Sequence, residues 1–249
     1  MYINFDTKYK IAKFISNTLG HNFKNNNYKC LLYHSIGYNY DDDKLNIYNI
    51  SKETFRNQMI KLSELNYEVS NNISDNVLNT NRITITFDDG LLSIYKNALE
   101  ILEHLNIPYT IFVSPQLIKS NSRMYMNEDQ IKSISKSKLC QIGSHGYEHK
   151  DFTLYNLQDL AEIQKKSKNY LENLIGQQIN ILSYPFGKYN SKIDKVMKKI
   201  DFQYTFSSKF GSNSYNSTII NRIDIWNNDN TIDFTNKLKG QWDWLKYYK

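Results

Sequence analysis

The stretch Ile83-Thr84-Ile85-Thr86-Phe87-Asp88-Asp89-Gly90 runs a β-branched and aromatic segment directly into two adjacent carboxylates and a glycine. This composition predicts a buried strand over residues 82–87. Two neighbouring carboxylates at the end of a buried strand repel each other unless a positive group compensates them, and a bound metal ion is a common solution. A plain Asp-Gly turn with solvated carboxylates is the alternative, and the segment taken alone favours it.

Six further segments predict strands, and amphipathic segments between them predict helices. The other predicted strands are 28–33, 109–113, 139–143, 180–184, 203–207 and 218–225. The predicted helices are 51–65, 91–105, 127–137, 156–175, 190–200 and 231–246. Strands that alternate with helices are typical of parallel sheets with crossover helices. The pattern therefore predicts an α/β fold, either a barrel or a doubly wound sheet.

The length and composition indicate one domain with a packed core. The 249 residues are 40% hydrophobic and 14% aromatic, which excludes a disordered chain, and no Pro- or Gly-rich linker divides them. The net charge is +6, but the sequence contains no basic stripe interleaved with aromatic residues, so we expect no nucleic-acid partner. Cys30 and Cys140 lack metal or redox spacing and are expected as buried thiols. The abundant Asn residues have no period and are interpreted as surface composition.

Three more predicted strands end in polar or turn-forming groups. His145 and His149 follow the strand at 139–143, and their spacing lets both bind one ion, although such a pair alone is more often solvated or buried. His34 ends the first strand, and Tyr184-Pro185-Phe186-Gly187 follows the strand at 180–184. Two His and one Asp form a three-ligand set that leaves positions open, as in catalytic sites. Barrel enzymes build active sites at this end of their strands.

These segments together resemble the polysaccharide deacetylases, the NodB-homology group of carbohydrate esterase family four. The resemblance rests on Thr86 to Gly90, on the His145/His149 pair and on the Tyr184-Pro185-Phe186-Gly187 loop, and it extends over roughly residues 28–225. It implies a single-domain, distorted (β/α)7 barrel over 28–249, after a helical extension over 1–27. It also implies removal of acetyl groups from sugars with one divalent metal, commonly Zn²⁺, with Co²⁺, Ni²⁺ or Mn²⁺ as alternatives.

The resemblance assigns a role to each matching residue. Asp88 corresponds to the general base, and the metal ligands correspond to Asp89, His145 and His149. The backbone N–H of Phe186 corresponds to an oxyanion donor, in a loop with Tyr184 and Pro185.

The general acid of the family is the His of a Leu-x-His motif, which lies near the C-terminus in most members. Here no His follows His149, and Leu32-Tyr33-His34 supplies the motif at the N-terminal side. This position resembles the circularly permuted branch that includes biofilm poly-N-acetylglucosamine deacetylases, so we expect His34 to be the acid.

Two departures from the family pattern leave alternatives open. Ser183 stands where many members have the Arg that orients the catalytic Asp. Arg222 either supplies that charge from the last predicted strand or pairs with Asp224. The family's Asp-Trp motif has no clear counterpart, and groove wall and core packing are both open for Trp226, Trp242 and Trp244.

The sequence therefore predicts a metal-dependent hydrolase that releases acetate from an N-acetylated amino sugar in a polysaccharide or glycan precursor. Hydrolysis of another acyl or amide group and a non-catalytic sugar-binding relative remain as alternatives. The chain shows no secretory signal or membrane span, so we expect a cytoplasmic protein and a lipid- or nucleotide-linked substrate for a surface glycan. Membrane-surface contact through residues 8–14 and 242–249 stays open. The sequence does not predict the oligomeric state.

Overall fold

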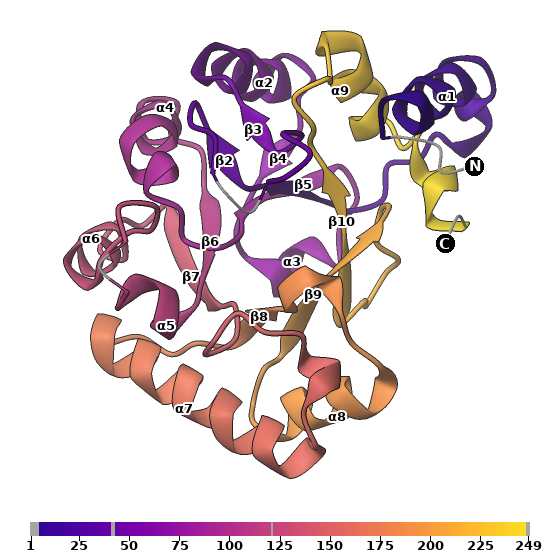
Figure 1. The fold of residues 1–249 in the computed structure, drawn as a ribbon. Coiled ribbons are helices and arrows are strands. Elements are labelled where there is room, and N and C mark those ends of the chain that lie inside the picture. Colours follow the sequence, from indigo (N-terminus) through magenta and orange to yellow (C-terminus); the bar gives the residue numbers. More distant parts are fainter. Residues whose placement is uncertain (1–4, 41–42, 121, 248–249) are drawn as a thin grey trace.

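Seven parallel strands close into a barrel in the computed structural model, which describes residues 5–40, 43–120 and 122–247 (Figure 1). The strands follow one another around the barrel in the order β1, β10, β9, β8, β7, β6 and β5, and pairing of β1 with β5 closes it. Their bounds are β1 Lys29–Tyr33, β5 Arg82–Phe87, β6 Tyr109–Val113, β7 Cys140–Ser144, β8 Ile181–Ser183, β9 Tyr204–Phe210 and β10 Ile219–Asp224. All seven predicted strands are confirmed. Of the two folds that the strand pattern allowed, a barrel and a doubly wound sheet, the structure has the barrel.

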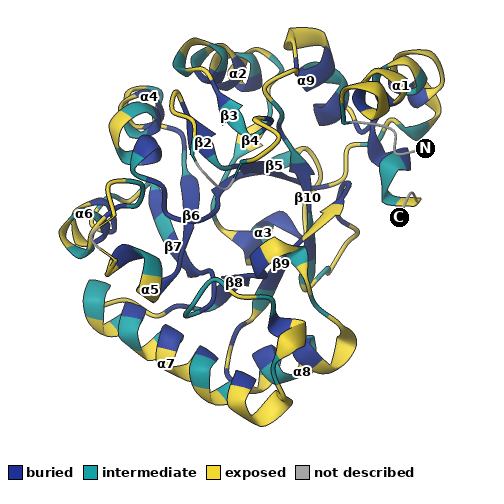
Figure 2. Cartoon of the chain, viewed as in Figure 1, coloured by how far each residue is buried: buried dark blue, intermediate teal, exposed yellow. Residues whose placement is uncertain are grey.

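Helices surround the barrel, and three short strands lie outside the ring. The short strands are β2 Ser35–Ile36, β3 Asn49–Ile50 and β4 Glu68–Val69. The helices are α1 Phe5–Thr18, α2 Lys52–Glu64, α3 Ile73–Asn76, α4 Leu99–His104, α5 Pro115–Ile118, α6 Glu128–Ile134, α7 Leu157–Ile175, α8 Ser191–Lys199 and α9 Thr231–Leu238. The outer faces of the helices are exposed, and most residues of the barrel strands are buried (Figure 2).

Two predicted helices differ from the observed ones. The segment predicted over 91–105 begins with a π-helical turn at Ile94–Ala98 before α4. The segment predicted over 231–246 breaks into α9 and a 3₁₀ turn at Asp243–Tyr247. Gly240 lies between them with φ +77°, a conformation that ends a helix.

Asparagine has a local structural role that its irregular spacing does not reveal. Five helices begin at an Asn whose side-chain oxygen accepts a backbone N–H of the first turn, which satisfies one of the unpaired N–H groups there. These residues are Asn72, Asn127, Asn156, Asn190 and Asn230. All five residues are exposed, as the interpretation of Asn as surface composition expects, and among the described residues they also cap helices.

Alternation along each strand divides the apolar residues into two clusters. Ile83, Ile85 and Phe87 of β5 face outward into the core beneath the helices. The inward cluster fills the barrel and includes Tyr28, Cys30, Ile73, Val77, Phe112, Ile181, Phe206 and Ile220. Two of its members come from α3 and the residue after it, so this short helix closes the end of the barrel where the strands begin. The opposite rim is left for polar groups.

The N-terminal helix α1 packs into the outer core. Tyr9 and Ala12 are buried in it, and Lys13 forms an ion pair of 2.7 Å with Asp233 of α9. Trp242 and Trp244 are buried, so core packing accounts for both. Residues 248–249 of the predicted membrane-contacting end lie outside the described residues. Within the described ranges, no helix combines the length and apolar character needed to cross a bilayer.

Candidate active site

One pocket at the rim where the strands end receives side chains from several strands. The inward positions at the strand ends are Leu32 near the end of β1, His34 directly after β1, Asp88 directly after β5 and Asp224 at the end of β10. The pocket has a volume of about 330 Å³. Its lining residues are Leu32, His34, Tyr40, Tyr48, Asp88, Asp89, His145, His149, Phe186, Ser208 and Asp224.

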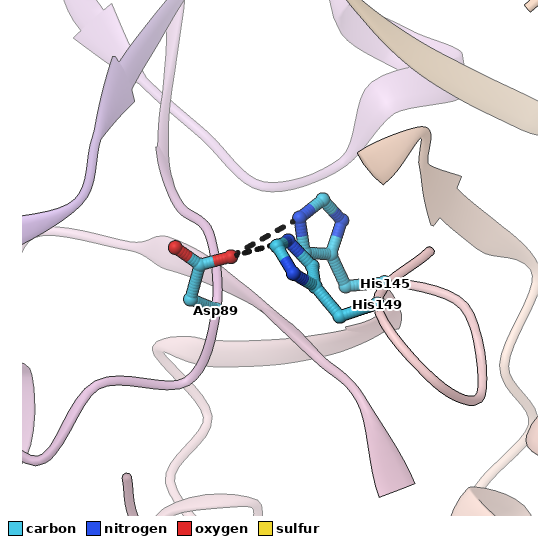
Figure 3. Close-up of side chains that lie close together, drawn as sticks. All are labelled: Asp89, His145 and His149. Atoms are coloured by element: carbon cyan, nitrogen blue, oxygen red, sulfur yellow. Dashed lines mark ion pairs between the residues drawn. The ribbon is translucent and has the colours of Figure 1, made fainter. Parts of the chain in front are cut away.

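Asp89, His145 and His149 converge on one point (Figure 3). Oδ1 of Asp89 lies 3.3 Å from Nε2 of His145 and 3.0 Å from Nε2 of His149. Two ligands that each lie about 2.0–2.2 Å from a tetrahedral ion are about 3.4 Å apart, so the three donor atoms fit one divalent ion. A carboxylate with two imidazoles is a donor set for Zn²⁺ or another first-row divalent metal.

Neighbouring groups fix which nitrogen of His145 faces the candidate metal centre. Nδ1 of His145 lies 2.9 Å from the carbonyl oxygen of Ser183 and donates a hydrogen bond to it. The lone pair of Nε2 is therefore the one available to a metal ion. Burial lowers the pKa of His145, but Asp88 and Asp89 raise it more. Burial likewise raises the pKa of Asp89, and hydrogen bonds from His145 and His149 bring it well below its ordinary value.

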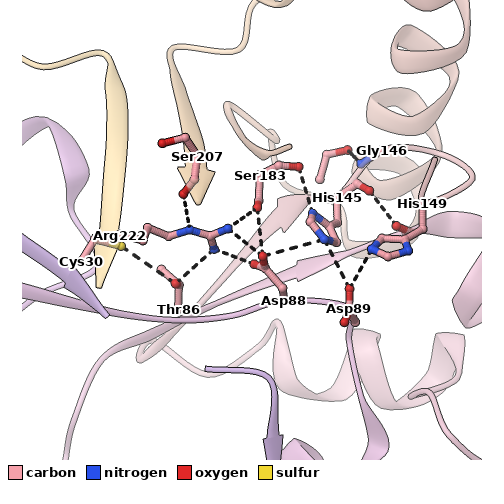
Figure 4. Close-up of polar contacts among 12 residues, drawn as sticks. Cys30, Thr86, Asp88, Asp89, His145, Gly146, His149, Ser183, Ser207 and Arg222 are labelled. Carbon is pink, nitrogen blue, oxygen red and sulfur yellow. Dashed lines mark hydrogen bonds and ion pairs between the residues drawn. The ribbon is translucent and has the colours of Figure 1, made fainter. Parts of the chain in front are cut away.

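Arg222 binds Asp88 inside the barrel and forms no ion pair with Asp224 among the described residues (Figure 4). Its two terminal nitrogens each donate to one oxygen of Asp88 at 2.7 Å. Arg222 also donates to the carbonyl oxygen of Ser207 at 2.9 Å and to Oγ of Ser183 at 2.8 Å. Ser183 in turn donates to Asp88 at 3.2 Å. Of the two alternatives, the structure places Arg222 against Asp88, with Ser183 as a shared neutral partner.

The Arg222 guanidinium keeps the buried Asp88 carboxylate ionised. Burial raises the pKa of Asp88, but the charges of Arg222 and His145 and the hydrogen bonds from Arg222 lower it below its ordinary value. The carboxylate is thus an available proton acceptor next to the Asp89/His145/His149 triad.

The loop after β8 presents Phe186 to the pocket under backbone strain. Phe186 has φ +57° and His149 has φ +54°, and among the described residues these are the only positive-φ positions that are not Gly, Asn or Asp. The two rings contact each other, with centroids 4.8 Å apart. Tyr184 and Pro185 are buried and do not line the pocket; Tyr184 donates its hydroxyl to Asp194 at 2.7 Å. These two residues support the loop, and only Phe186 faces the candidate site.

His34 lines the same pocket. Its ring stands over Tyr48 at a centroid distance of 4.5 Å, and its buried Nδ1 has no hydrogen-bond partner among the described residues. Burial lowers the pKa of His34, and Asp89 and Asp88 only partly offset this.

The sequence did not predict that four residues line the pocket: Tyr40, Tyr48, Ser208 and Asp224. Asp224 and Ser208 occupy inward positions two residues after Arg222 and Phe206, so strand alternation was the available signal. Burial raises the pKa of Asp224 to about 6. The tyrosines come from the irregular segment after β1, where no periodicity applies.

A barrel that gathers three side chains able to hold a metal ion and a buried, ionised carboxylate at one rim has the architecture of a metal-assisted hydrolase. The sequence profile described as polysaccharide deacetylase matches residues 75–205, more than half of the chain. The chain therefore belongs to the polysaccharide deacetylase family. Removal of N-acetyl groups by such enzymes is hydrolysis of carbon–nitrogen bonds other than peptide bonds.

Curated relatives agree with this family. The putative polysaccharide deacetylase YxkH of Bacillus subtilis is 29% identical over 132 residues, which are 53% of this chain and 46% of that protein. The poly-β-1,6-N-acetyl-D-glucosamine N-deacetylase of Staphylococcus epidermidis is 30% identical over 136 residues, 50% of this chain and 47% of that protein. The match thus spans less than half the length of each of these relatives.

Solved structures share the fold at low identity. The deacetylase PplD of Streptococcus pyogenes, in complex with acetate, has a TM-score of 0.76 at 21% identity, covering 85% of this chain and 98% of that one. IcaB from Ammonifex degensii has a TM-score of 0.73 at 21% identity, covering 86% and 97%. These similarities confirm the single (β/α)7 barrel.

Arg222→Gln is expected to destabilise the fold by about 3–5 kcal/mol at neutral pH, because it leaves Asp88 buried without its cation. The depressed pKa of Asp88 contributes stability above the unfolded-state pKa of about 3.9, and this contribution disappears as pH falls through the lower folded-state pKa. The difference between variant and wild type in urea unfolding should therefore shrink on acidification. Arg82→Gln, which removes a more exposed ion pair with Glu68, is the control; equal losses for both variants would contradict the assignment.

His149→Ala is expected to weaken Zn²⁺ binding by more than about 100-fold, since it removes one of the three candidate ligands. Metal content after dialysis, measured by mass spectrometry, checks this. His104→Ala is the matched control because His104 is exposed on α4. Retention of the ion by the His149 variant would exclude this residue as a ligand.

Proposed function

We propose that this protein hydrolyses the N-acetyl group of an amino sugar in a polysaccharide or glycan precursor and releases acetate. The observation that carries the proposal is the juxtaposition of an ionised Asp88, held by Arg222, with the Asp89/His145/His149 triad in one pocket. The family and its named N-deacetylase relative support the substrate class.

Asp89, His145 and His149 are the residues that would hold the metal. A divalent ion bound there supplies Lewis-acid chemistry, polarising the acetamide carbonyl and lowering the pKa of water. Zn²⁺ is proposed, and Co²⁺, Ni²⁺ and Mn²⁺ suit the same donor set.

The remaining side chains move protons and stabilise charge. Asp88 accepts a proton from the attacking water while Arg222 keeps its carboxylate oriented through two hydrogen bonds. As the water oxygen bonds to the carbonyl carbon, the backbone N–H of Phe186 donates to the developing oxyanion. The C–N bond then breaks as the leaving nitrogen takes a proton from the imidazolium form of His34, and afterwards Asp88 releases the proton it accepted and His34 regains one, which restores both groups. Water and amide thus become acetate and a free amino sugar.

His34 is proposed as this acid because it lines the pocket with Asp88 and has no competing partner on Nδ1 among the described residues. Its position in Leu32-Tyr33-His34, directly after β1, resembles the motif of the permuted branch of the family. Two other functions remain as alternatives: hydrolysis of a different acyl or amide group, which the same site would perform, and sugar binding without catalysis, against which the complete set of base, ligands and acid argues.

Acetate release from N-acetylglucosamine oligomers and from nucleotide-linked N-acetyl sugars, by Zn²⁺-loaded protein, tests the proposal. Asp88→Asn should lower the rate by about 10²–10⁴-fold, because the proton acceptor is lost, while metal content stays at the wild-type level. Full activity of the Asn variant would exclude Asp88 as the base. Bound metal without acetate release from any of these sugars would favour another acyl substrate, and absence of metal would favour a non-catalytic protein.

His34→Asn should reduce hydrolysis of the acetamide far more than hydrolysis of an activated acetate ester such as 4-nitrophenyl acetate. An amine must be protonated before it leaves, whereas nitrophenolate leaves as an anion and needs no acid. The ratio of the two kcat/KM values measures this. His21→Asn, at an exposed position, should leave the ratio unchanged. An equal loss on both substrates would mean that His34 has a structural role only.

A further inference from the structure

A second pocket adjoins the candidate active site along the barrel rim. It has a volume of about 180 Å³ and is lined by Ser35, Tyr38, Asn39, Tyr40, Leu91, Leu92, Ser93, Lys96, Arg123 and Met124. Tyr40 lines both pockets. Ser35 directly follows His34, and Leu91 lies two residues after Asp89. The two pockets are therefore neighbouring parts of one substrate-sized surface.

Backbone hydrogen bonds join the wall of this second pocket to the loop after β5, which carries Asp88 and Asp89. The N–H of Leu92 donates to the carbonyl oxygen of Met124 at 2.8 Å, and that of Met126 donates to the carbonyl oxygen of Gly90 at 2.9 Å. Arg123 precedes Met124, so its position is tied to the loop that carries Asp88 and Asp89. On the other side, Oγ of Ser35 lies 3.0 Å from Oγ of Ser93.

The two pockets differ in charge. The pocket of the candidate active site has three carboxylates, Asp88, Asp89 and Asp224, whereas the described residues that line the second pocket include Lys96 and Arg123 and no acidic residue. Throughout the described ranges, neither Lys96 nor Arg123 has a carboxylate within ion-pair distance, in contrast to Arg82 and Lys52, which pair with Glu68 and Glu100. The acidic residues at 41–42 lie outside these ranges.

The origin of Lys96 also distinguishes it from an ordinary helix-surface lysine. It lies in the π-helical turn Ile94–Ala98, a departure from regular α-helix that is frequent at functional sites. Asn97 of the same turn donates to the carbonyl oxygen of Ile36 at 2.7 Å, which joins the turn to the segment after β1.

We propose that Lys96 and Arg123 bind an anionic group, a phosphate or a carboxylate, carried by the substrate beside its N-acetyl sugar. Arg offers a planar pair of N–H donors and Lys a point charge, and together they suit a tetrahedral or planar oxyanion. This inference rests on the proposed function and narrows its substrate class. A neutral polymer has no group for these two cations, whereas a phosphate-linked precursor or an acidic glycan has one.

The test compares three substrates that differ only at the reducing end. An N-acetylglucosamine tetramer, the same tetramer with a reducing-end phosphate and the tetramer oxidised to a reducing-end carboxylate are assayed for acetate release. Wild type should favour at least one anionic substrate by about 10- to 100-fold in kcat/KM, since hydrogen bonds to charged groups contribute about 1.5–3 kcal/mol. The preference should fall as salt rises. The phosphate and carboxylate arms identify which anion is recognised.

The K96Q/R123Q double variant should abolish this preference. The K192Q/K195Q variant, with the same change in charge on exposed positions of α8, should retain it, and circular dichroism confirms the fold of both. Equal kcat/KM values of wild type for all three substrates, or a preference unchanged by K96Q/R123Q, would overturn the inference.

A binding measurement separates this inference from the proposed function. Calorimetric affinities of the three tetramers for metal-loaded Asp88→Asn protein should show the same charge preference, and K96Q/R123Q in that background should remove it. If no acetate is released from any substrate and the charge-dependent binding is present, the deacetylase proposal fails and the anion site stands. If acetate is released without charge-dependent binding, the anion site fails and the deacetylase proposal stands.

Discussion

The buried pair between Arg222 and Asp88 is the interaction on which the arrangement of the site depends. Placing two adjacent carboxylates at the mouth of an apolar barrel is unfavourable unless a cation is fixed nearby. Arg222 comes from β10, which is separated from β5 by β1, so its side chain reaches past β1 inside the barrel to meet Asp88 with both terminal nitrogens. Arg222 compensates the charge of the ionised Asp88, while Asp89 faces His145 and His149. One ion pair thus divides neighbouring, chemically identical residues into two different roles.

Much of this could be predicted from local sequence, because strand propensity and alternation are local properties. The seven strands and the gathering of Asp88, His34 and the His145/His149 pair at one rim follow from runs of apolar residues that end in polar ones. The partner of Arg222 could not be predicted, since Asp88 and Asp224 are both charge-compatible and only the strand order decides between them. The break after Leu238 was also missed, because one Gly does not reveal by itself that the chain adopts positive φ there.

In the loops at the rim of the barrel, some residues have a strained backbone conformation and others support the loop through buried contacts. His149 and Phe186 adopt left-handed backbone conformations that their side chains disfavour, and their rings contact each other. Behind them, Tyr184 is anchored by Asp194, and its ring stacks on Tyr189 at 4.8 Å. The buried Tyr184 thus supports the loop in which the exposed Phe186 adopts a conformation disfavoured for its side chain. No pattern of hydrophobicity carries this information, because it depends on contacts between separate loops.

Closure of the barrel has a consequence for the order of events during synthesis on the ribosome. Strand β1 pairs on one side with β5 and on the other with β10, which is translated after all the other barrel strands. Until β10 emerges, one edge of β1 lacks its partner, and exposed strand edges recruit other chains. The same late strand delivers Arg222. The nascent protein therefore passes through a stage in which the edge is open and Asp88 has no counter-charge, when chaperone protection matters most.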